Sequence, residues 1–363
     1  MVKQVGIAVV GAGYWGPHII RNVAELPESK LVAIADLSPE RLYPLRARYP
    51  DVMMTTNVQD ILRDDVHAVI LATPVNSHYN LARQALRAGK HVLIEKPLTR
   101  TSAEGLALIR LAEEKGLALM VGHTFEYNPA VVAMHEIVRR GDIGRVLYID
   151  AARLNLGQFR NDVNVLWDLA PHDISIINMI LGATPTHVSA RGNTCVHPQM
   201  HDVAYLELRY PDAIMGHIHV SWLEPAKVRR VTVVGEEKMI VYNDLAFEEK
   251  LRIYDKGVVK TSSSGDYADF QLTYHNRGVV IPPVTGSEPL KIEIAHFVDC
   301  ILHGKPPQSD GWVGLGVTQV LEAANRSLMN GGGRKKVQSG GKLNDLEVER
   351  QLRLVSREKS IAG

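Results

Sequence analysis

The sequence predicts an α/β protein with two domains: a doubly wound parallel sheet, then an α+β domain with a large, open, mostly antiparallel sheet. Over residues 1–123, short β-rich runs alternate with helical stretches, which is the pattern of a parallel sheet covered by helices. From residue 144 onward, apolar and polar residues alternate with a period of two between turns, as in strands that bury one face.

The parallel sheet is expected from a series of apolar runs. An amphipathic helix over 102–115 separates the last two runs, and the glycines at 89 and 116 mark helix ends before the next strand. The predicted strands are residues 5–10, 31–35, 68–72, 91–94 and 117–121.

In the second half, one helix over 168–181 interrupts the strands, with Gly182 as its stop. A loop-rich stretch, 261–289, precedes helices over 291–303 and 313–329. The predicted strands are residues 146–155, 186–192, 202–210, 213–222, 229–234, 239–243 and 250–254. We therefore expect domains at 1–123 and 124–330, and a polar tail at 331–363 that is either a peripheral helix or disordered.

Composition narrows the class of protein. A length of 363 residues suits two domains. Lys and Arg number 41 against 40 Asp and Glu with no long block of one sign, so nucleic-acid or membrane-surface binding is not expected. No segment approaches ~18 continuous apolar residues and no signal-peptide pattern precedes the first strand, so we expect a cytoplasmic protein. Cys195 and Cys300 stand far apart, which indicates neither a disulfide framework nor a zinc site.

The first predicted strand leads into the hexapeptide GAGYWG at residues 11–16, a G-x-G-x-x-G motif between a strand and a helix. This context is typical of a dinucleotide-binding Rossmann domain. Gly11 allows the tight turn, Gly13 lets a pyrophosphate approach the backbone, and Gly16 lets the helix pack on the strand. The helix N-terminus attracts the phosphates, so Tyr14 and Trp15 are assigned to the same cofactor loop.

The second strand ends in Asp36, at about the spacing of an acid that binds the adenine ribose. Its carboxylate would accept from both ribose hydroxyls and repel a 2′-phosphate. Leu37 and Ser38 follow, with no adjacent Arg for such a phosphate, so the expected cofactor is NAD.

The segment after the third strand, residues 72–78, lies where a parallel sheet presents its ligands. The cofactor residues expected in it are Thr73, Pro74, Asn76 and His78. A plain β–α connection, with Asn76 or Ser77 capping the next helix, is an equally good interpretation for those two residues.

Glu95, Lys96 and Pro97 follow the fourth strand on the same edge of the sheet, and Glu95 and Lys96 are assigned to the cofactor site. A lysine at this position can stabilise a developing alkoxide or relay a proton. The alternative is a surface lysine at a strand end.

Asp168 and His172 form a second chemical cluster, four residues apart and so on one face of a helix. A carboxylate beside imidazole fixes its tautomer and raises its basicity, which suits His172 to abstract a hydroxyl proton. Alternatively, Asp168 or Asp173 caps a helix that Pro171 helps to start, and capping is the favoured role for Asp173.

Metal binding is the alternative that the histidines raise. His217 and His219 face the same way on a predicted strand, and His201 and Asp202 lie upstream. No acidic or cysteine partner recurs at ligand spacing, so no metal site is expected.

Along almost its whole length the chain resembles the glucose-fructose oxidoreductase / inositol dehydrogenase / MocA family. The motifs that carry the resemblance are residues 11–16, 72–78, 95–97, 121–129, Asp168 with His172, 293–297 and 321–324. The resemblance implies NAD(P)-dependent oxidation or reduction of sugar hydroxyls, with Lys96, Asp168 and His172 at the catalytic positions. Glu126 stands where relatives often carry Arg.

The resemblance extends to enzymes that act on nucleotide-linked amino sugars, through residues 164–173, 219–223 and 274–290. It implies oxidation of the C3 hydroxyl of a UDP-linked amino sugar such as UDP-N-acetylglucosamine. A dehydrogenase of a free sugar, cyclitol or glycoside and a non-catalytic NAD-binding regulator are the alternatives. The family also implies a homo-oligomer, dimer or tetramer, formed through the open sheet. The residues expected in the substrate site are Lys96, Tyr127, Arg153, Asn155, Asn164, Trp167, Asp168 and His172.

Overall fold

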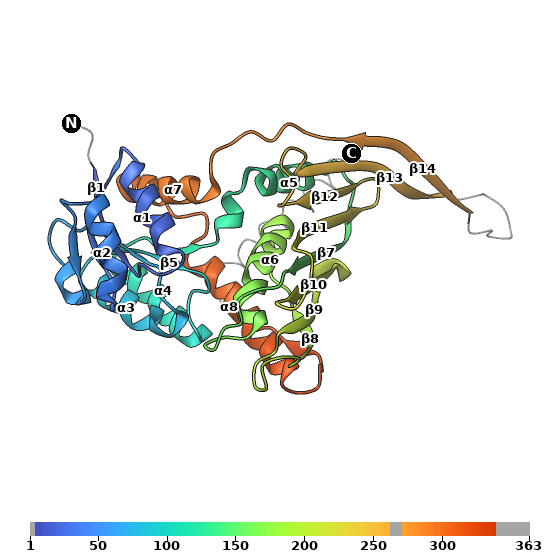
Figure 1. The fold of residues 1–363 in the computed structure, drawn as a ribbon. Coiled ribbons are helices and arrows are strands. Elements are labelled where there is room, and N and C mark those ends of the chain that lie inside the picture. Colours follow the sequence, from blue (N-terminus) through green and yellow to red (C-terminus); the bar gives the residue numbers. More distant parts are fainter. Residues whose placement is uncertain (1–3, 262–270, 339–363) are drawn as a thin grey trace. The chain divides into compact units, whose positions relative to one another are not determined.

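A computed structural model describes residues 4–261 and 271–338. The chain divides into two compact units (Figure 1). Unit 1 combines Met1–Tyr127 with Ser287–Gln319, and unit 2 combines Asn128–Gly286 with Val320–Gly363. The division differs from the predicted domains, because a late segment that the sequence pattern placed in the second domain returns to the first.

Unit 1 is built on a six-stranded sheet with the order β3-β2-β1-β4-β5-β6. All its pairings are parallel. The chain moves outward from β1 to β3 and then returns to the other side of β1, so the loops after β1 and β4 meet at a topological switch point, where such sheets bind ligands. The strands are β1 (Val5–Val10), β2 (Ser29–Ala35), β3 (Met53–Thr55), β4 (Ala68–Leu71), β5 (His91–Glu95) and β6 (Leu119–Gly122).

Strand alternation sends the apolar side chains of β1 into two cores. Ile7 and Val9 pack on one face with residues of α1 (Gly16–Glu25) and α7 (Pro289–His303). Ala8 and Val10 pack on the other face, with residues of α3 and α4. Both faces of the sheet are therefore buried, as doubly wound sheets require. The remaining helices of this unit are α2 (Pro39–Arg48), η1 (Val58–Ile61), α3 (Val75–Arg87), α4 (Ser102–Glu114) and η2 (Thr124–Tyr127).

Helix α7 explains why the chain returns to unit 1. Its residues Leu290, Ile294 and Phe297 are buried in the core that also contains Ile19 and Ile20 of α1. The apolar spacing of this helix predicts a buried face, but it does not say which sheet that face covers.

Unit 2 is built on a nine-stranded sheet with the order β14-β13-β12-β11-β7-β10-β9-β8-β15. The pair β7–β10 is parallel and the other pairings are antiparallel, so the predicted mostly antiparallel sheet is confirmed. The strands are β7 (Val146–Leu154), β8 (His187–Asn193), β9 (Val203–Arg209), β10 (Met215–Ser221), β11 (Val228–Gly235), β12 (Met239–Asn243), β13 (Leu251–Thr261), β14 (Gln271–Val280) and β15 (Lys335–Lys336).

Helices α5 (Pro129–Arg140) and α6 (Val165–Leu181) pack on this sheet (Figure 1). Helix α6 contacts β7, β9 and β10, where Leu206, Ile218 and Val220 are buried. The helix α8 (Gly311–Leu328) passes from unit 1 into unit 2, and η3 (Pro211–Ala213) joins β9 to β10.

Three details differ from the predictions. The structure adds β3, and it adds β14 inside the stretch predicted to be loop-rich. Helix α6 begins at Val165 rather than 168, because the Asn164 side chain caps it by accepting from the Trp167 backbone N–H at 3.2 Å. Of the predicted tail, residues 339–363 lie outside the described part of the chain. Within the described ranges, none of the helices is long and apolar enough to cross a bilayer.

Candidate active site

The glycine loop has the geometry that a bound dinucleotide needs. Gly11 has φ +98°, and a Cβ added there would lie 2.5 Å from the Ala72 carbonyl oxygen. A Cβ on Gly16 would lie 2.1 Å from the Gly11 oxygen, so only glycine fits where α1 crosses β1. At Gly13 the nearest atom to an added Cβ is Arg41 Nη1 at 3.7 Å, which leaves that side open for a pyrophosphate.

Asp36 is held at the end of β2 by two backbone donors. Its Oδ2 accepts from Ala12 N at 2.7 Å, and its Oδ1 accepts from Ser38 N at 2.8 Å. The side chain is buried and braces the glycine loop, in the place expected for a ribose-binding acid. Arg41 Nη1 lies 3.5 Å from Asp36 Oδ2. Arg41 is not adjacent to Asp36 in the sequence, but the first turn of α2 places it beside the carboxylate.

The loop after β4 is braced internally. Ser77 Oγ donates to Thr73 Oγ1 at 2.7 Å and to the Pro74 carbonyl at 2.8 Å. Pro74 is the N-cap of α3 and no side chain caps that helix, so the capping alternative for Asn76 and Ser77 is wrong. Asn76 is exposed, as a ligand contact requires.

His78 binds the protein rather than presenting its ring to a ligand. Its Nε2 lies 2.8 Å from the Thr73 oxygen and its Nδ1 lies 3.0 Å from the Pro97 oxygen. The ring is buried, so it joins the loops after β4 and β5, and we assign it to bracing those loops. Burial lowers the pKa of His78.

Lys96 follows β5 and is half-buried, at the edge of the sheet that carries the glycine loop. Burial raises the pKa of the neighbouring Glu95 carboxyl to about 7, against the opposing charge of Lys96 and a hydrogen bond from the Trp15 indole. Burial and the Lys96 charge lower the pKa of His123 to about 3, so that imidazole is neutral. Lys96 therefore acts on two neighbouring groups, the titrating carboxyl of Glu95 and the uncharged imidazole of His123.

In unit 2, α6 places Asp168 and His172 four residues apart on one helix face, and both are partly exposed. Asp168 Oδ2 accepts from the Trp222 indole at 3.1 Å, and Asp168 Oδ1 lies 3.5 Å from Arg160 Nη1. These two partners orient the carboxylate. Arg160 was not singled out from the sequence, because a charged residue in a loop gives no periodic signal.

Two helix-terminus assignments made from the sequence, for Asp173 and Pro171, are wrong, and two predicted substrate residues, Arg153 and Tyr127, are buried. Asp173 does not cap α6: it lies inside the helix and forms a buried two-bond ion pair with Arg153, with both N–O distances 2.9 Å. Arg153 is therefore buried and held in place by this pair. Tyr127 lies in the core of unit 1, where its hydroxyl is 2.9 Å from Ser309 Oγ and its ring packs on His296. Pro171 does not start the helix but lies inside it.

The other predicted substrate residues lie near Asp168 in unit 2. Asn164 caps α6 and also donates to Asn325 Oδ1 at 3.2 Å. Trp167 is partly exposed on the first turn of α6. Asn155 follows β7, and its backbone N–H donates to the Ser221 carbonyl at 3.2 Å, next to Trp222.

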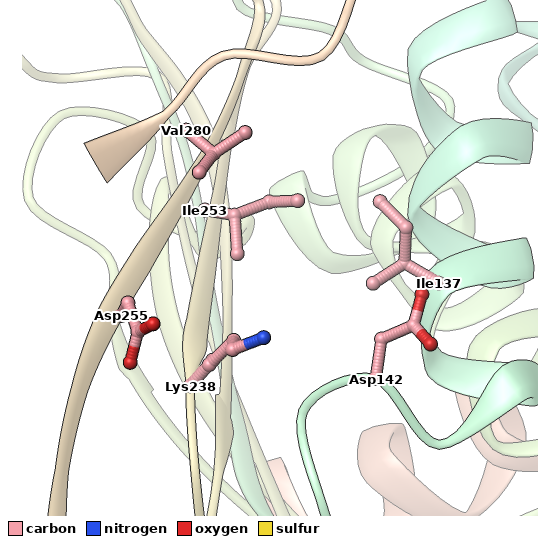
Figure 2. A pocket seen from close by; sticks show the side chains of 6 residues that line it. All are labelled: Ile137, Asp142, Lys238, Ile253, Asp255 and Val280. Carbon is pink, nitrogen blue, oxygen red and sulfur yellow. The ribbon is translucent and has the colours of Figure 1, made fainter. Parts of the chain in front are cut away.

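A separate cavity of about 240 Å³ lies in unit 2 between α5 and strands β12–β14 (Figure 2). Its lining residues are Ile137, Asp142, Lys238, Ile253, Asp255 and Val280. None of the residues that the sequence singled out for chemistry lines it.

Over the residues that the structure describes, no group of three or more His, Cys, Asp or Glu side chains is arranged to hold a metal ion. His217 instead pairs with Asp150 at 2.8 Å.

The fold and this loop geometry define an NAD-binding α/β oxidoreductase. Residues 5–123 match the oxidoreductase family with an NAD-binding Rossmann fold, and residues 131–241 match the GFO/IDH/MocA C-terminal domain. The chain belongs to the GFO/IDH/MocA oxidoreductase family, whose members include dehydrogenases of sugars and cyclitols. The resemblance inferred from the sequence motifs and the NAD cofactor are confirmed.

Similar proteins span nearly the full length. The scyllo-inositol 2-dehydrogenase (NAD(+)) of Bacillus subtilis is 27% identical over 354 residues, which cover 91% of this chain and 96% of that protein. The UDP-N-acetylglucosamine 3-dehydrogenase of Acidithiobacillus ferrooxidans is 28% identical over 322 residues, 87% of this chain and 94% of that protein. The crystal structure of GenD2 from gentamicin A biosynthesis, in complex with NAD, has the same fold, with a TM-score of 0.78 at 24% identity over 93% of this chain and 98% of that one.

Proposed function

We propose that the protein oxidises the C3 hydroxyl of a UDP-linked amino sugar such as UDP-N-acetylglucosamine and gives a 3-keto sugar. One observation carries the proposal: unit 1 has a half-buried lysine at its cofactor edge, and in unit 2 an oriented Asp168 lies four residues from His172 on a partly exposed face of α6. NAD, which the glycine loop and Asp36 would hold, would supply the hydride acceptor. The sugar loses one hydride and one hydroxyl proton, so each turnover yields a ketone, NADH and a proton.

The side chains divide this chemistry between them. His172 takes the hydroxyl proton, because Asp168, four residues away on the same helix face, supports the protonated imidazole. Lys96 stabilises the negative charge that develops on the oxygen. Trp222 and Arg160 keep Asp168 oriented through their contacts with its two oxygens.

The sugar class is supported by the relative that acts on UDP-N-acetylglucosamine. The alternative, a dehydrogenase of a free sugar, cyclitol or glycoside, is supported by the relative that acts on scyllo-inositol.

The test is NADH formation by the purified full chain with NAD and a panel that contains UDP-N-acetylglucosamine, UDP-glucose, scyllo-inositol and D-apiose. We expect the highest kcat/KM with UDP-N-acetylglucosamine. Reduction of the product with borodeuteride should then place deuterium at C3.

His172→Asn should abolish this turnover, and His135→Asn, a change on α5 of the same unit, should leave it in place. Turnover only with a cyclitol would transfer the assignment to the alternative. NAD binding without turnover of any hydroxyl compound would favour a regulatory protein.

We further infer that two copies of the chain associate through the sheet of unit 2, on the face away from α5 and α6. That face presents Tyr148 and Tyr205, both exposed, and the Tyr205 ring stacks on His219 with ring centroids 4.1 Å apart. Exposed aromatic side chains of this kind mark interfaces. Light scattering should give a dimer or tetramer, and Tyr205→Glu should shift it to smaller species. An unchanged mass in that variant would exclude this face.

A further inference from the structure

Three glutamates of unit 1 each have a buried carboxyl oxygen without a hydrogen-bond partner among the described residues, and no step of the proposed reaction uses them. We call Glu95, Glu126 and Glu293 the acid cluster. They come from the end of β5, from η2 and from α7, which are distant in sequence. Buried acids are rare unless something pairs with them, so the cluster needs an explanation.

Strand pairing and one hydrogen bond bring Glu95 and Glu293 to the same corner. Glu95 pairs with Gly122 across β5 and β6, and a Cβ added to Gly122 would lie 3.2 Å from both Cδ and Oε1 of Glu95. Two residues after Gly122, Thr124 Oγ1 donates to Glu293 Oε2 at 2.8 Å. Gly122 therefore leaves the space that the Glu95 carboxyl occupies.

Each carboxyl of the pair has one buried oxygen without a partner. Oε1 of Glu95 and Oε1 of Glu293 accept no hydrogen bond from any residue that the structure describes. Leaving a buried acceptor of an ionised carboxylate unpaired is costly, and two neighbouring carboxylates do not both ionise. One proton held by the pair relieves both costs.

The groups that act on the cluster are few. Trp15 donates to Glu95 and Lys96 places its charge near Glu95, while Asp310 acts on Glu126. His123 is buried and neutral, and Tyr127 is affected by the charges of Glu126 and Glu293. Among these groups, Lys96 supplies the positive charge.

We propose that Glu95 and Glu293 hold one proton between them, with Glu293 protonated, and that the remaining negative charge of Glu95 keeps Lys96 in its ammonium form. This rests on the role of Lys96 in the proposed function. Glu95 and Glu293 are positioning residues, since they act through Lys96. Burial and the charge of Glu95 raise the pKa of Glu293 well above its ordinary value, and burial raises that of Glu95 to about 7, in agreement with one retained proton at neutral pH.

Infrared spectroscopy of the full chain tests the shared proton without any turnover. A Glu126→Gln background removes the third carboxyl. In that background, the carbonyl band of a protonated carboxylic acid should persist above neutral pH, and Glu293→Gln should remove it. Glu114→Gln, which changes an exposed glutamate, is the matched control and should retain the band. Absence of the band before any change to Glu293, or its persistence in Glu293→Gln, would overturn the shared proton.

Competitive acetylation followed by peptide mass spectrometry tests the effect on Lys96. Glu95→Gln removes the negative charge, so burial should lower the pKa of Lys96 and its labelling at about pH 8 should rise roughly tenfold, which corresponds to one pKa unit. Glu293→Leu, which leaves Glu95 in place but removes the proton donor, should give a smaller rise. Glu293→Gln keeps an N–H donor and should stay near the original rate.

Labelling of Lys115, at the end of α4, should not change in any variant. Unchanged Lys96 labelling in both Glu95→Gln and Glu293→Leu would overturn the proposal. Neither measurement needs a substrate, so the pair is tested even where the proposed dehydrogenase reaction fails.

Discussion

The two units treat buried charge in opposite ways. In unit 2, Arg153 and Asp173 are fully buried and joined by two hydrogen bonds, and Asp168 is fixed by Trp222 and Arg160. In unit 1, Glu95 and Glu293 each have a buried oxygen without a hydrogen-bond partner among the described residues, and Glu95 lies beside the Lys96 cation. Paired charges hold positions, whereas burial raises the pKa of an acid that has no cation partner. Unit 2 therefore supplies geometry, and unit 1 supplies a charge that responds to pH.

The largest effect on the reaction rate is expected from a change to Lys96 in unit 1. Lys96→Met should reduce kcat by about 10²–10⁴, the range for removal of one proton-transfer group or one charge that stabilises the transition state. NAD affinity should stay nearly unchanged, because the side chain acts on the sugar. Lys115→Met, at an exposed position, is the control. Calorimetry measures the affinity for NAD, and steady-state kinetics measure kcat. Near-full activity of Lys96→Met would show that Lys96 is a surface residue without a catalytic role.

The paired charges of unit 2 should dominate stability instead of rate. Arg153→Met removes the ion pair from the buried Asp173 side chain, which should cost about 3–5 kcal/mol of unfolding free energy. Arg145→Met removes an exposed pair with Glu236 and should cost at most about 1 kcal/mol. Urea unfolding measures both. Replacing Asp173 by Leu in the Arg153→Met background should recover most of the loss, and equal losses in the two single variants would contradict the comparison.

Much of this contrast between the two units could not be predicted from the sequence. The glycine motif and the period-two alternation predicted both sheets, because these patterns are local. They missed β3, which is only three residues long, and β14, an edge strand with mostly exposed side chains. They also placed α7 in the wrong unit, since an apolar helix face does not name its partner.

Site residues could be predicted only where their place on a strand or helix indicates a chemical role. Lys96 was assigned from its place at a strand end, and Asp168 with His172 from helical spacing. The capping role given to Asp173 was wrong because the helix begins at Asn164. Glu293 belongs to a motif of the family resemblance, but no role was predicted for its side chain, since a glutamate beside apolar residues on a helix is usually exposed.

The unpaired acids of unit 1 should lower stability as pH rises. Burial, with the charge of Asp310, raises the pKa of Glu126 to about 8. The folded state then keeps a proton that the unfolded chain loses above its ordinary pKa of about 4.5, so this group contributes less stability as pH rises from about 5 to 8. Glu126→Gln should remove that loss and gain on the order of 3 kcal/mol at about pH 8 relative to pH 5. Urea midpoints of variant and original at both pH values test it, and a pH-independent difference would contradict it.

The smallest effect concerns Asp36 and Arg41 at the cofactor loop. This pair belongs to unit 1, but it joins opposite charges as the pairs of unit 2 do. Asp36 should repel a 2′-phosphate, so NAD should bind more tightly than NADP. Asp36→Ala should narrow that ratio by about tenfold, or about 1.4 kcal/mol, because it removes the repulsion and releases Arg41 to pair with the phosphate. In Asp36→Ala with Arg41→Ala the part of the gain that depends on Arg41 should disappear, while Arg41→Ala alone should leave NAD affinity near its original value. Equilibrium binding of both cofactors to all four proteins separates repulsion by Asp36 from attraction by Arg41. Equal affinity of the unchanged protein for NAD and NADP would remove Asp36 from cofactor selection.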